Sequence, residues 1–259
     1  MNHYQLEEYQ KKGFIILPKI PLFLEEAIEG KMQESEFSIK FYESDETTVR
    51  SYYGFHRDPE IKEWLEKNET IKSICQTIYG KQETYIHQSK INIKNKAESS
   101  VWPYHRDFPF WNIFDGIKEN KLLNLVLFLD DVNEENGALG FIPSSQNYFL
   151  EREENFKSQS FSLDGSASSD LLFDFTAEEV ESLKQKFGHE LSLGPKGSIL
   201  IFNPNTIHGS SFSREDFSRK ILILTFNTCD NPPNITFTRP DYLCASDIKP
   251  IQWQKINEW

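Results

Sequence analysis

Short segments typical of β-strands fill the chain from Thr84 onward, and they limit the possible folds more than any other feature of the sequence. They are rich in β-branched or aromatic residues and bounded by Gly, Pro, Asn or Asp: 84–93, 101–105, 122–129, 139–142, 198–202 and 220–227. Few helical segments separate them, whereas parallel strands need a crossover of a dozen or more residues. The pattern therefore predicts an antiparallel sandwich or barrel, with a tight turn at Asn136-Gly137.

Helices are expected around this strand-rich region, mainly in the first third of the chain. Apolar residues recur there at spacings of three and four in four segments, and one short β-like run follows the first of them. The helical segments are 4–12, 22–32, 59–67 and 70–79, and the β-like run is 13–18. A further helix is expected at 177–187.

The 259 residues are expected to form one domain that covers 1–259. Its core would span 84–229, after a mostly helical part at 1–83 and before an irregular tail at 230–259. Residues 151–176 are rich in Ser, Asp and Glu and show little periodicity. A segment of this length inside a compact domain is usually a lid, a binding loop or disordered, and a lid is our hypothesis.

Composition argues against several classes of function. The chain has 28 basic and 40 acidic side chains and a formal net charge of −12, which disfavours nucleic-acid binding. No apolar run approaches the roughly 20 residues of a membrane-spanning helix, and no secretory signal is visible, so a cytoplasmic protein is expected. The three cysteines, Cys75, Cys229 and Cys244, include no C-x-x-C pair for zinc or redox chemistry.

Two histidines occur in contexts that suggest metal binding. His105 and Asp107 follow the start of a strand segment, and side chains two apart on a strand share a face. His208 follows the segment that ends at Phe202, and a strand packed opposite would bring it to the same place. Two histidines and one carboxylate form the facial triad of non-haem Fe(II) oxygenases, which leaves metal positions open. Taken alone, the pattern also fits a chance His-x-Asp and an ordinary loop histidine.

Arg219 strengthens the interpretation as a metal site. It follows His208 by eleven residues and stands at the start of an apolar strand segment. A guanidinium there can grip a carboxylate through two parallel hydrogen bonds, as a dicarboxylate co-substrate bound to the metal would need. The simpler interpretation is a surface arginine at the edge of a strand.

Four linked motifs surround these residues. They are His87-Gln88-Ser89-Lys90-Ile91-Asn92; Tyr104-His105-Arg106-Asp107-Phe108 with Trp111 and Asp115-Gly116; Asn136-Gly137-Ala138-Leu139 with Ile142-Pro143-Ser144-Ser145; and Pro195-Lys196-Gly197-Ser198 with His208-Gly209-Ser210. Together they resemble the phytanoyl-CoA dioxygenase superfamily of Fe(II)/2-oxoglutarate oxygenases, and within it the ectoine hydroxylases most closely. The resemblance runs from about 84 to 242 in order and spacing, and several linked motifs are far more specific than one.

The resemblance implies a mainly β fold with flanking helices and a double-stranded β-helix (jelly-roll, cupin-like) core. It implies that iron is bound at a catalytic centre made of His105, Asp107 and His208. By the same resemblance, 2-oxoglutarate is held by Gln88, Asn92, Lys94, Ser210 and Arg219. Fe(II), 2-oxoglutarate and O2 would then hydroxylate a small molecule, with release of succinate and CO2. A polar outer face of one strand would also explain the alternation of Gln88, Asn92 and Lys94.

Six positions are expected to face the substrate. By the resemblance, Trp111 and Phe202 keep the aromatic character of the ectoine pocket, and four positions differ from it: Ile86, Leu122, Asn124 and Ile223. The expected pocket is bulkier and more aliphatic, with one amide, which favours a free amino acid or an amino-acid derivative. Asp107 favours hydroxylation over halogenation, because halogenases of the superfamily carry a small residue there; desaturation stays possible.

Three alternatives remain beside this hypothesis. The first is an ectoine hydroxylase proper, the second is a non-catalytic jelly-roll binding module, and the third is an enzyme that oxidises a protein side chain, which would need a long open groove. A module of that kind typically loses a metal ligand or the arginine, whereas this chain keeps all four residues. The sequence leaves the oligomeric state open.

Overall fold

A computed structural model describes residues 1–18, 36, 38–95, 101–148, 175–214, 217–234 and 239–254. The helix expected at 22–32 lies outside the described residues. So does the possible lid at 151–176, except for its last two residues. No helix within the described ranges is long and apolar enough to cross a membrane.

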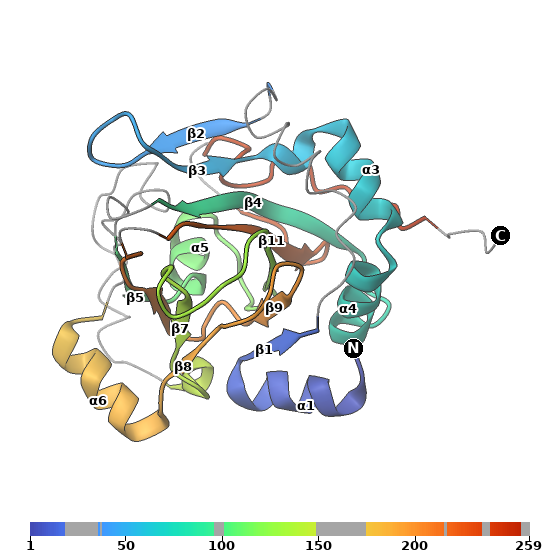
Figure 1. Ribbon diagram of the computed structural model, residues 1–259. Coiled ribbons are helices and arrows are strands. Elements are labelled where there is room, and N and C mark those ends of the chain that lie inside the picture. The colour runs from blue at the N-terminus through green and yellow to red at the C-terminus, as the bar shows by residue number, and fades with distance from the viewer. Residues whose placement is uncertain are drawn as a thin grey trace.

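A large antiparallel sheet runs through the centre of the molecule (Figure 1). Its strands, in spatial order, are β1 (Phe14–Leu17), β9 (Ile199–Phe202), β6 (Leu123–Phe128), β11 (Arg219–Thr228), β4 (Thr84–Lys94), β3 (Val49–Tyr53) and β2 (Ile39–Tyr42). The central strand β6 is buried along its whole length and β11 at every residue except Lys220, as their apolar sequences predict.

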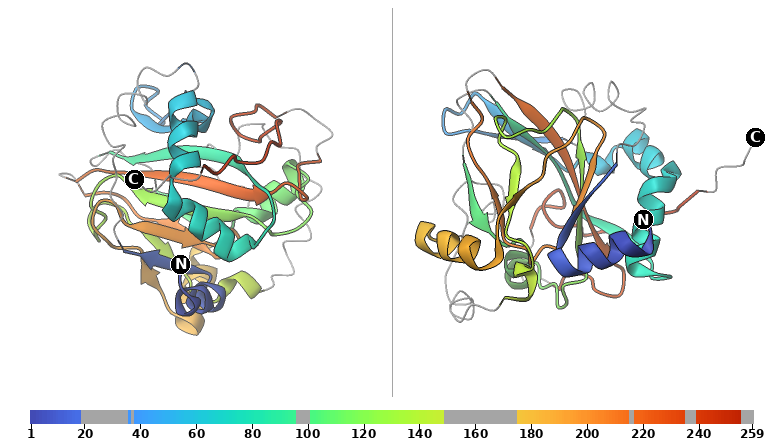
Figure 2. Two further views of the ribbon diagram at one scale, coloured as in Figure 1. Left: turned by 90° about the vertical axis from the view of Figure 1, so that its right-hand side faces the viewer. Right: turned by 60° about the horizontal axis from the view of Figure 1, so that its bottom comes forward.

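A smaller antiparallel sheet faces the large one. Its strands, in spatial order, are β5 (Trp102–His105), β10 (His208–Ser210), β7 (Leu139–Phe141) and β8 (Glu190–Leu191). Aromatic and aliphatic side chains from both sheets, such as Phe202 and Phe141, pack into one buried cluster between them. The two layers are visible side by side in Figure 2. The predicted mainly β, antiparallel two-sheet architecture is therefore confirmed.

Helices cover the outer face of the large sheet. They are α1 (His3–Lys12), α3 (Pro59–Lys67) and α4 (Glu69–Tyr79), and the last two lie in front of the sheet in the left view of Figure 2. Each begins at a side-chain cap, at Asn2, Asp58 and Asn68 respectively, and each buries an apolar stripe against the sheet. Four further helical elements of the described residues lie elsewhere: α5 (Phe108–Phe114), α6 (Ala177–Phe187) and the short 3₁₀ helices Phe55–Arg57 and Ser145–Asn147.

Residues 1–83 contribute more to the sheet than the sequence predicted. Their described part supplies β1, β2 and β3 in addition to α1, α3 and α4, so a mostly helical description is incomplete. Only β1 had been anticipated, as the run at 13–18. The turn at Asn136-Gly137 is present, with φ of 74° at Gly137 alone. It carries the chain from the large sheet to the small one, because β6 and β7 belong to different sheets.

A β-bulge in β4 decides which residues of this strand face the small sheet. Thr225 pairs with Gln88 and Phe226 pairs with Ile86, so His87 is an extra residue in the ladder. The bulge reverses the alternation of side chains. Ile86 therefore packs with Ile91 in the cluster under the helices instead of facing the small sheet.

Candidate active site

Two histidines lie opposite each other on neighbouring strands of the small sheet. His105 ends β5 and His208 begins β10, and the two residues are paired in register with ring centroids 4.4 Å apart. The Nδ1 atom of His105 lies 2.7 Å from the carbonyl oxygen of Pro103, and that of His208 lies 2.9 Å from the carbonyl oxygen of Thr206. An N–H at Nδ1 donates to each carbonyl, which leaves the Nε2 lone pairs free to bind a metal.

Asp107 completes this group of side chains. It stands just after β5, at the N-terminal end of α5, and its backbone N–H donates to the carbonyl of Pro204 over 2.9 Å. Its Oδ1 lies 3.4 Å from Nε2 of His105, and its Oδ2 lies 3.8 Å from Nε2 of His208. One ligand atom from each residue falls within 4.8 Å of the others. The structure thus brings together all three residues of the predicted triad.

The charges at this site suit a divalent cation. Burial alone would raise the pKa of Asp107, but the neighbouring His208 and His105 hold it well below its usual range. Burial, and then the neighbouring His105, lower the pKa of His208 to about 4. At neutral pH the site therefore offers an ionised carboxylate and a neutral imidazole, which are the forms that bind metals. Two nitrogens and one oxygen are the donor set of non-haem iron centres.

Arg219 lines the same cavity as the triad. It is 2% exposed, and its Nη2 donates to the carbonyl of Gly137 over 2.7 Å. Its Nε and Nη1 have no hydrogen-bond partner among the described residues, and the same holds for Oγ of Ser210 and Oδ1 of Asn92. Buried polar atoms are rarely left unpaired. The Arg219 and Ser210 atoms can donate to the carboxylate of a bound anion such as 2-oxoglutarate, whereas Oδ1 of Asn92 is an acceptor.

Lys94 and Gln88 occupy the two ends of the same face of β4. Lys94 is 2% exposed, and burial together with the neighbouring Arg219 lowers its pKa to about 7. Gln88 donates through Nε2 to the carbonyl of Leu243 over 2.9 Å, and so ties β4 to the C-terminal segment. Neither side chain lines the cavity. Lys94 stands next to Arg219 in the ladder, whereas the amide of Gln88 is engaged elsewhere.

Two of the six expected substrate residues, Phe202 and Ile223, line the cavity beside the triad. Four further lining residues were missed: Lys90, Trp102, Leu139 and Gly209. Lys90 could have been found, because it lies between Gln88 and Asn92 on a strand with a period of two. Its Nζ lies 5.9 Å from the ring centres of both Tyr53 and Trp102.

The other four expected substrate residues lie elsewhere. Trp111 and Leu122 pack in a separate apolar cluster behind α5, and Trp111 meets the His87 ring edge to face at 5.6 Å. Asn124 donates through Nδ2 to Oδ2 of Asp107 over 2.7 Å, so its amide contacts the carboxylate of the triad. Ile86 is turned away by the bulge in β4. We therefore do not retain Trp111, Leu122 and Ile86 as substrate contacts.

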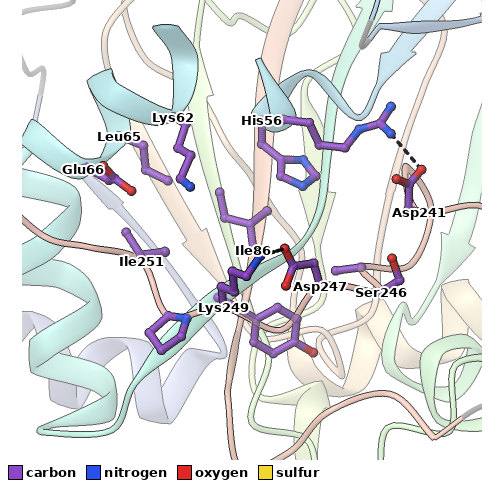
Figure 3. A pocket seen from close by; sticks show the side chains of 14 residues that line it. His56, Lys62, Leu65, Glu66, Ile86, Asp241, Ser246, Asp247, Lys249 and Ile251 are labelled. Atoms are coloured by element: carbon purple, nitrogen blue, oxygen red, sulfur yellow. Dashed lines mark hydrogen bonds and ion pairs between the residues drawn. The ribbon is translucent and has the colours of Figure 1, made fainter. Parts of the chain in front are cut away.

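Ile86 lines a larger cavity of about 360 Å³ on the helix side of the sheet (Figure 3). Charged side chains at its rim are paired with each other: Arg57 with Asp241 at 2.8 Å, and Lys249 with Asp247 at 2.7 Å. The cavity lies behind β4, away from the triad, and does not contribute to the candidate active site.

A second group of possible metal ligands consists of His87, Asp115 and Cys244, all fully buried. Asp115 accepts a hydrogen bond from Arg239, and its other oxygen lies 2.9 Å from Nε2 of His87. A guanidinium bound to the carboxylate opposes a second cation there. This group is a buried ion pair that ties α5 to β4 and to the C-terminal segment.

Comparison with known proteins agrees with this geometry. The family model for phytanoyl-CoA dioxygenase (PhyH) matches residues 9–221. The chain belongs to the phytanoyl-CoA dioxygenase family. It is 30% identical over 230 residues to L-proline trans-4-hydroxylase of Streptomyces griseoviridis, a match that covers 88% of this chain and 85% of that protein.

This chain is also similar to ectoine dioxygenases. That of Stutzerimonas stutzeri is 26% identical over 273 residues, which covers 96% of this chain and 87% of the relative. The crystal structure of EctD from S. alaskensis in its apo form has a TM-score of 0.82 at 21% identity, covering 98% and 87% of the two chains. These findings confirm the jelly-roll fold and the resemblance to ectoine hydroxylases. The protein is an Fe(II)- and 2-oxoglutarate-dependent dioxygenase.

Proposed function

We propose that this dioxygenase hydroxylates an aliphatic C–H bond of a free amino acid or a small amino-acid derivative. The observation that carries the proposal is one cavity lined both by the triad and by Arg219, whose Nε and Nη1 have no hydrogen-bond partner among the described residues. The similarity to an L-proline hydroxylase supports a substrate of amino-acid size. Phe202, Ile223 and Leu139 give this cavity the apolar wall that an aliphatic substrate needs.

In this proposal each residue has one task. His105, Asp107 and His208 would hold Fe(II) through two nitrogens and one oxygen. Arg219 would hold the distal carboxylate of 2-oxoglutarate, with Ser210 and Asn92 supplying further polar atoms. Bound iron and 2-oxoglutarate supply oxygen activation, in which O2 and 2-oxoglutarate give succinate, CO2 and a hydroxylated substrate. The buried wall between the two sheets excludes water from this chemistry.

The positive charge of Lys90 favours a substrate that carries an acidic group. Its ammonium lines the cavity, lies over the rings of Tyr53 and Trp102, and helps to lower the pKa of Asp107. A half-buried cation is stabilised further by a second ionised partner. The carboxylate of an amino acid would supply one.

A second candidate function is ectoine hydroxylation, which the similarity to ectoine dioxygenases favours. Of the four positions that differ from the ectoine pocket, only Ile223 lines the cavity of this protein. Its aliphatic side chain favours a smaller aliphatic substrate over the ectoine ring. Of the four differences, Ile223 alone therefore supports a preference for an amino acid over ectoine.

We propose that the protein is cytoplasmic. Cys75, Cys229 and Cys244 are free thiols in the structure, as expected in a reducing compartment.

Substrate preference can be measured as succinate release from iron-loaded protein. We expect an aliphatic amino acid, cyclic ones such as L-proline included, to exceed ectoine by about tenfold or more in kcat/KM, because one poorly fitted group costs about 1 to 3 kcal/mol. The comparison uses equal concentrations of each compound and a blank without substrate. Ectoine emerging as the best substrate would reject the amino-acid proposal and leave the iron site untouched.

Substitution of Arg219 tests the co-substrate site. In Arg219→Lys we expect the apparent KM for 2-oxoglutarate to rise about tenfold or more, because lysine keeps the charge but cannot make two parallel hydrogen bonds. The KM for the amino acid should change by less than about threefold. Arg214→Lys is the matched control, since Arg214 lies at the surface and pairs with Glu135. An unchanged KM for 2-oxoglutarate in Arg219→Lys would require another carboxylate anchor.

A further inference from the structure

Asn124 and Thr225 form a hydrogen-bonded pair directly behind the Asp107 carboxylate. The two residues face each other in register on β6 and β11, and each is 1% exposed. The Thr225 hydroxyl donates to Oδ1 of Asn124 over 2.7 Å, and Nδ2 of Asn124 donates to Oδ2 of Asp107 over 2.7 Å. A continuous chain of polar contacts therefore runs from the large sheet to the triad.

Asp107 has little other support for its side chain. Although it stands at the N-terminal end of α5, its carboxylate makes no capping hydrogen bond to that helix. The two histidines lie at 3.4 Å and 3.8 Å, and the positive charge of Lys90 also acts on the carboxylate. Within the described part of the chain, the Asn124 amide is the one group that holds this carboxylate from a side away from the histidines.

Asp107 decides which end of the Asn124 amide faces it, and Thr225 holds the amide in that orientation. Turning the amide over would place Oδ1 against a carboxylate oxygen and Nδ2 against the Thr225 hydroxyl. The first of these contacts joins two acceptors, which is unfavourable in a buried site. A hydroxyl that donates to Oδ1 stabilises the orientation in which Nδ2 points at the carboxylate. The effect of Thr225 on Asp107 is thus transmitted through Asn124.

We propose that Asn124, held by Thr225, is a positioning residue that occupies Oδ2 of Asp107 and leaves Oδ1 as the metal-binding oxygen. The inference rests on the proposed iron site. A carboxylate that binds through one oxygen uses one metal position, whereas binding through both would use two. The hydrogen bond from Asn124 therefore keeps positions free for the co-substrate and O2. Partners of this kind typically contribute 10- to 100-fold in metal affinity.

The test measures binding of Co(II) to the apoprotein, because its visible absorption reports coordination without turnover. Thr225→Val keeps the shape of the side chain and removes the hydroxyl, and we expect Co(II) to bind about tenfold more weakly. Thr225→Ser keeps the hydroxyl and should stay within about twofold of wild type. Asn124→Leu removes the donor itself and should lose about 10- to 100-fold. The absorption intensity of Co(II) should also change in Thr225→Val and Asn124→Leu.

Unchanged Co(II) affinity and spectrum in Thr225→Val would overturn the proposal. So would equal losses in Thr225→Ser and Thr225→Val, because packing and not the hydroxyl would then be responsible. If Asn124→Leu does not fold, the comparison of Thr225→Val with Thr225→Ser decides alone. Wild-type protein that binds no Co(II) would reject the iron site, and the positioning role with it. Failure of the positioning role alone gives a different result, in which the wild type and Thr225→Val bind Co(II) equally well.

Discussion

His208→Ala is expected to lower turnover by at least about a thousandfold. A bound metal typically contributes several kcal/mol to transition-state stabilisation, and about 4 kcal/mol corresponds to a factor of a thousand. His208 offers Nε2 to the site, and the other members of the triad cannot replace it, since His105 and Asp107 each supply one atom. Succinate release with Fe(II) in excess measures the loss.

The fold should survive this substitution. His208 lies at the start of a short strand whose backbone pairs with β5 and β7, and those pairings do not need the imidazole. His189→Ala is the matched control, because His189 hydrogen-bonds to Tyr104 near the surface and lies outside the triad. The control should keep near-normal turnover. Near-normal turnover in His208→Ala would show that the metal ligands have been assigned wrongly.

Asp115→Ala should cause the largest loss of stability of any substitution considered. Asp115 is completely buried and accepts hydrogen bonds from Arg239 and His87. Its removal leaves the buried Arg239 guanidinium without this carboxylate, and breaking a buried pair costs about 3 to 5 kcal/mol. For a chain of this size, Tm should fall by about 6 to 20 °C. Thermal unfolding followed by circular dichroism measures the shift.

Asp241→Ala is the matched control for Asp115→Ala. Asp241 pairs with Arg57 at 2.8 Å, but its side chain is 51% exposed. Exposed pairs contribute about 0 to 1 kcal/mol, so Tm should change by at most a few degrees. Similar Tm values for Asp115→Ala and Asp241→Ala would mean that the buried pair does not stabilise the contact between α5, β4 and the C-terminal segment.

Much of the fold could be predicted from the sequence, because long apolar strands carry a strong signal. The segments at 84–93, 122–129 and 220–227 became β4, β6 and β11, within two residues at each end. Shorter elements carry less signal. The strand β10, with three residues, could not be found from periodicity, and β2 and β3 owe their pairing to the neighbouring β4.

The triad could also be predicted, although one step of the reasoning differed from the structure. His105 and Asp107 were expected to share a face of one strand. In the structure β5 ends at His105, and the start of α5 turns the Asp107 carboxylate toward the histidines. The residue types and their spacing therefore predicted the triad, whereas the backbone conformation at Asp107 was not predicted.

The substrate side was the least predictable part of the site. Strict alternation along β4 fails at His87, because a bulge depends on pairing with β11, which a single strand does not encode. Asn124 was expected to face the substrate, but its amide reaches Asp107 from a neighbouring strand. Both outcomes depend on contacts between strands far apart in the sequence.

We propose that one cavity binds iron through His105, Asp107 and His208 and 2-oxoglutarate through Arg219. An anaerobic titration of the apoprotein with Fe(II) and 2-oxoglutarate tests it most directly, because chelation of iron by 2-oxoglutarate produces a visible charge-transfer band. We expect the band in the wild type, a much higher 2-oxoglutarate requirement in Arg219→Lys, and no band in His208→Ala. A wild-type protein without the band, or a His208→Ala variant that keeps it, would contradict the assignment of the iron and 2-oxoglutarate sites.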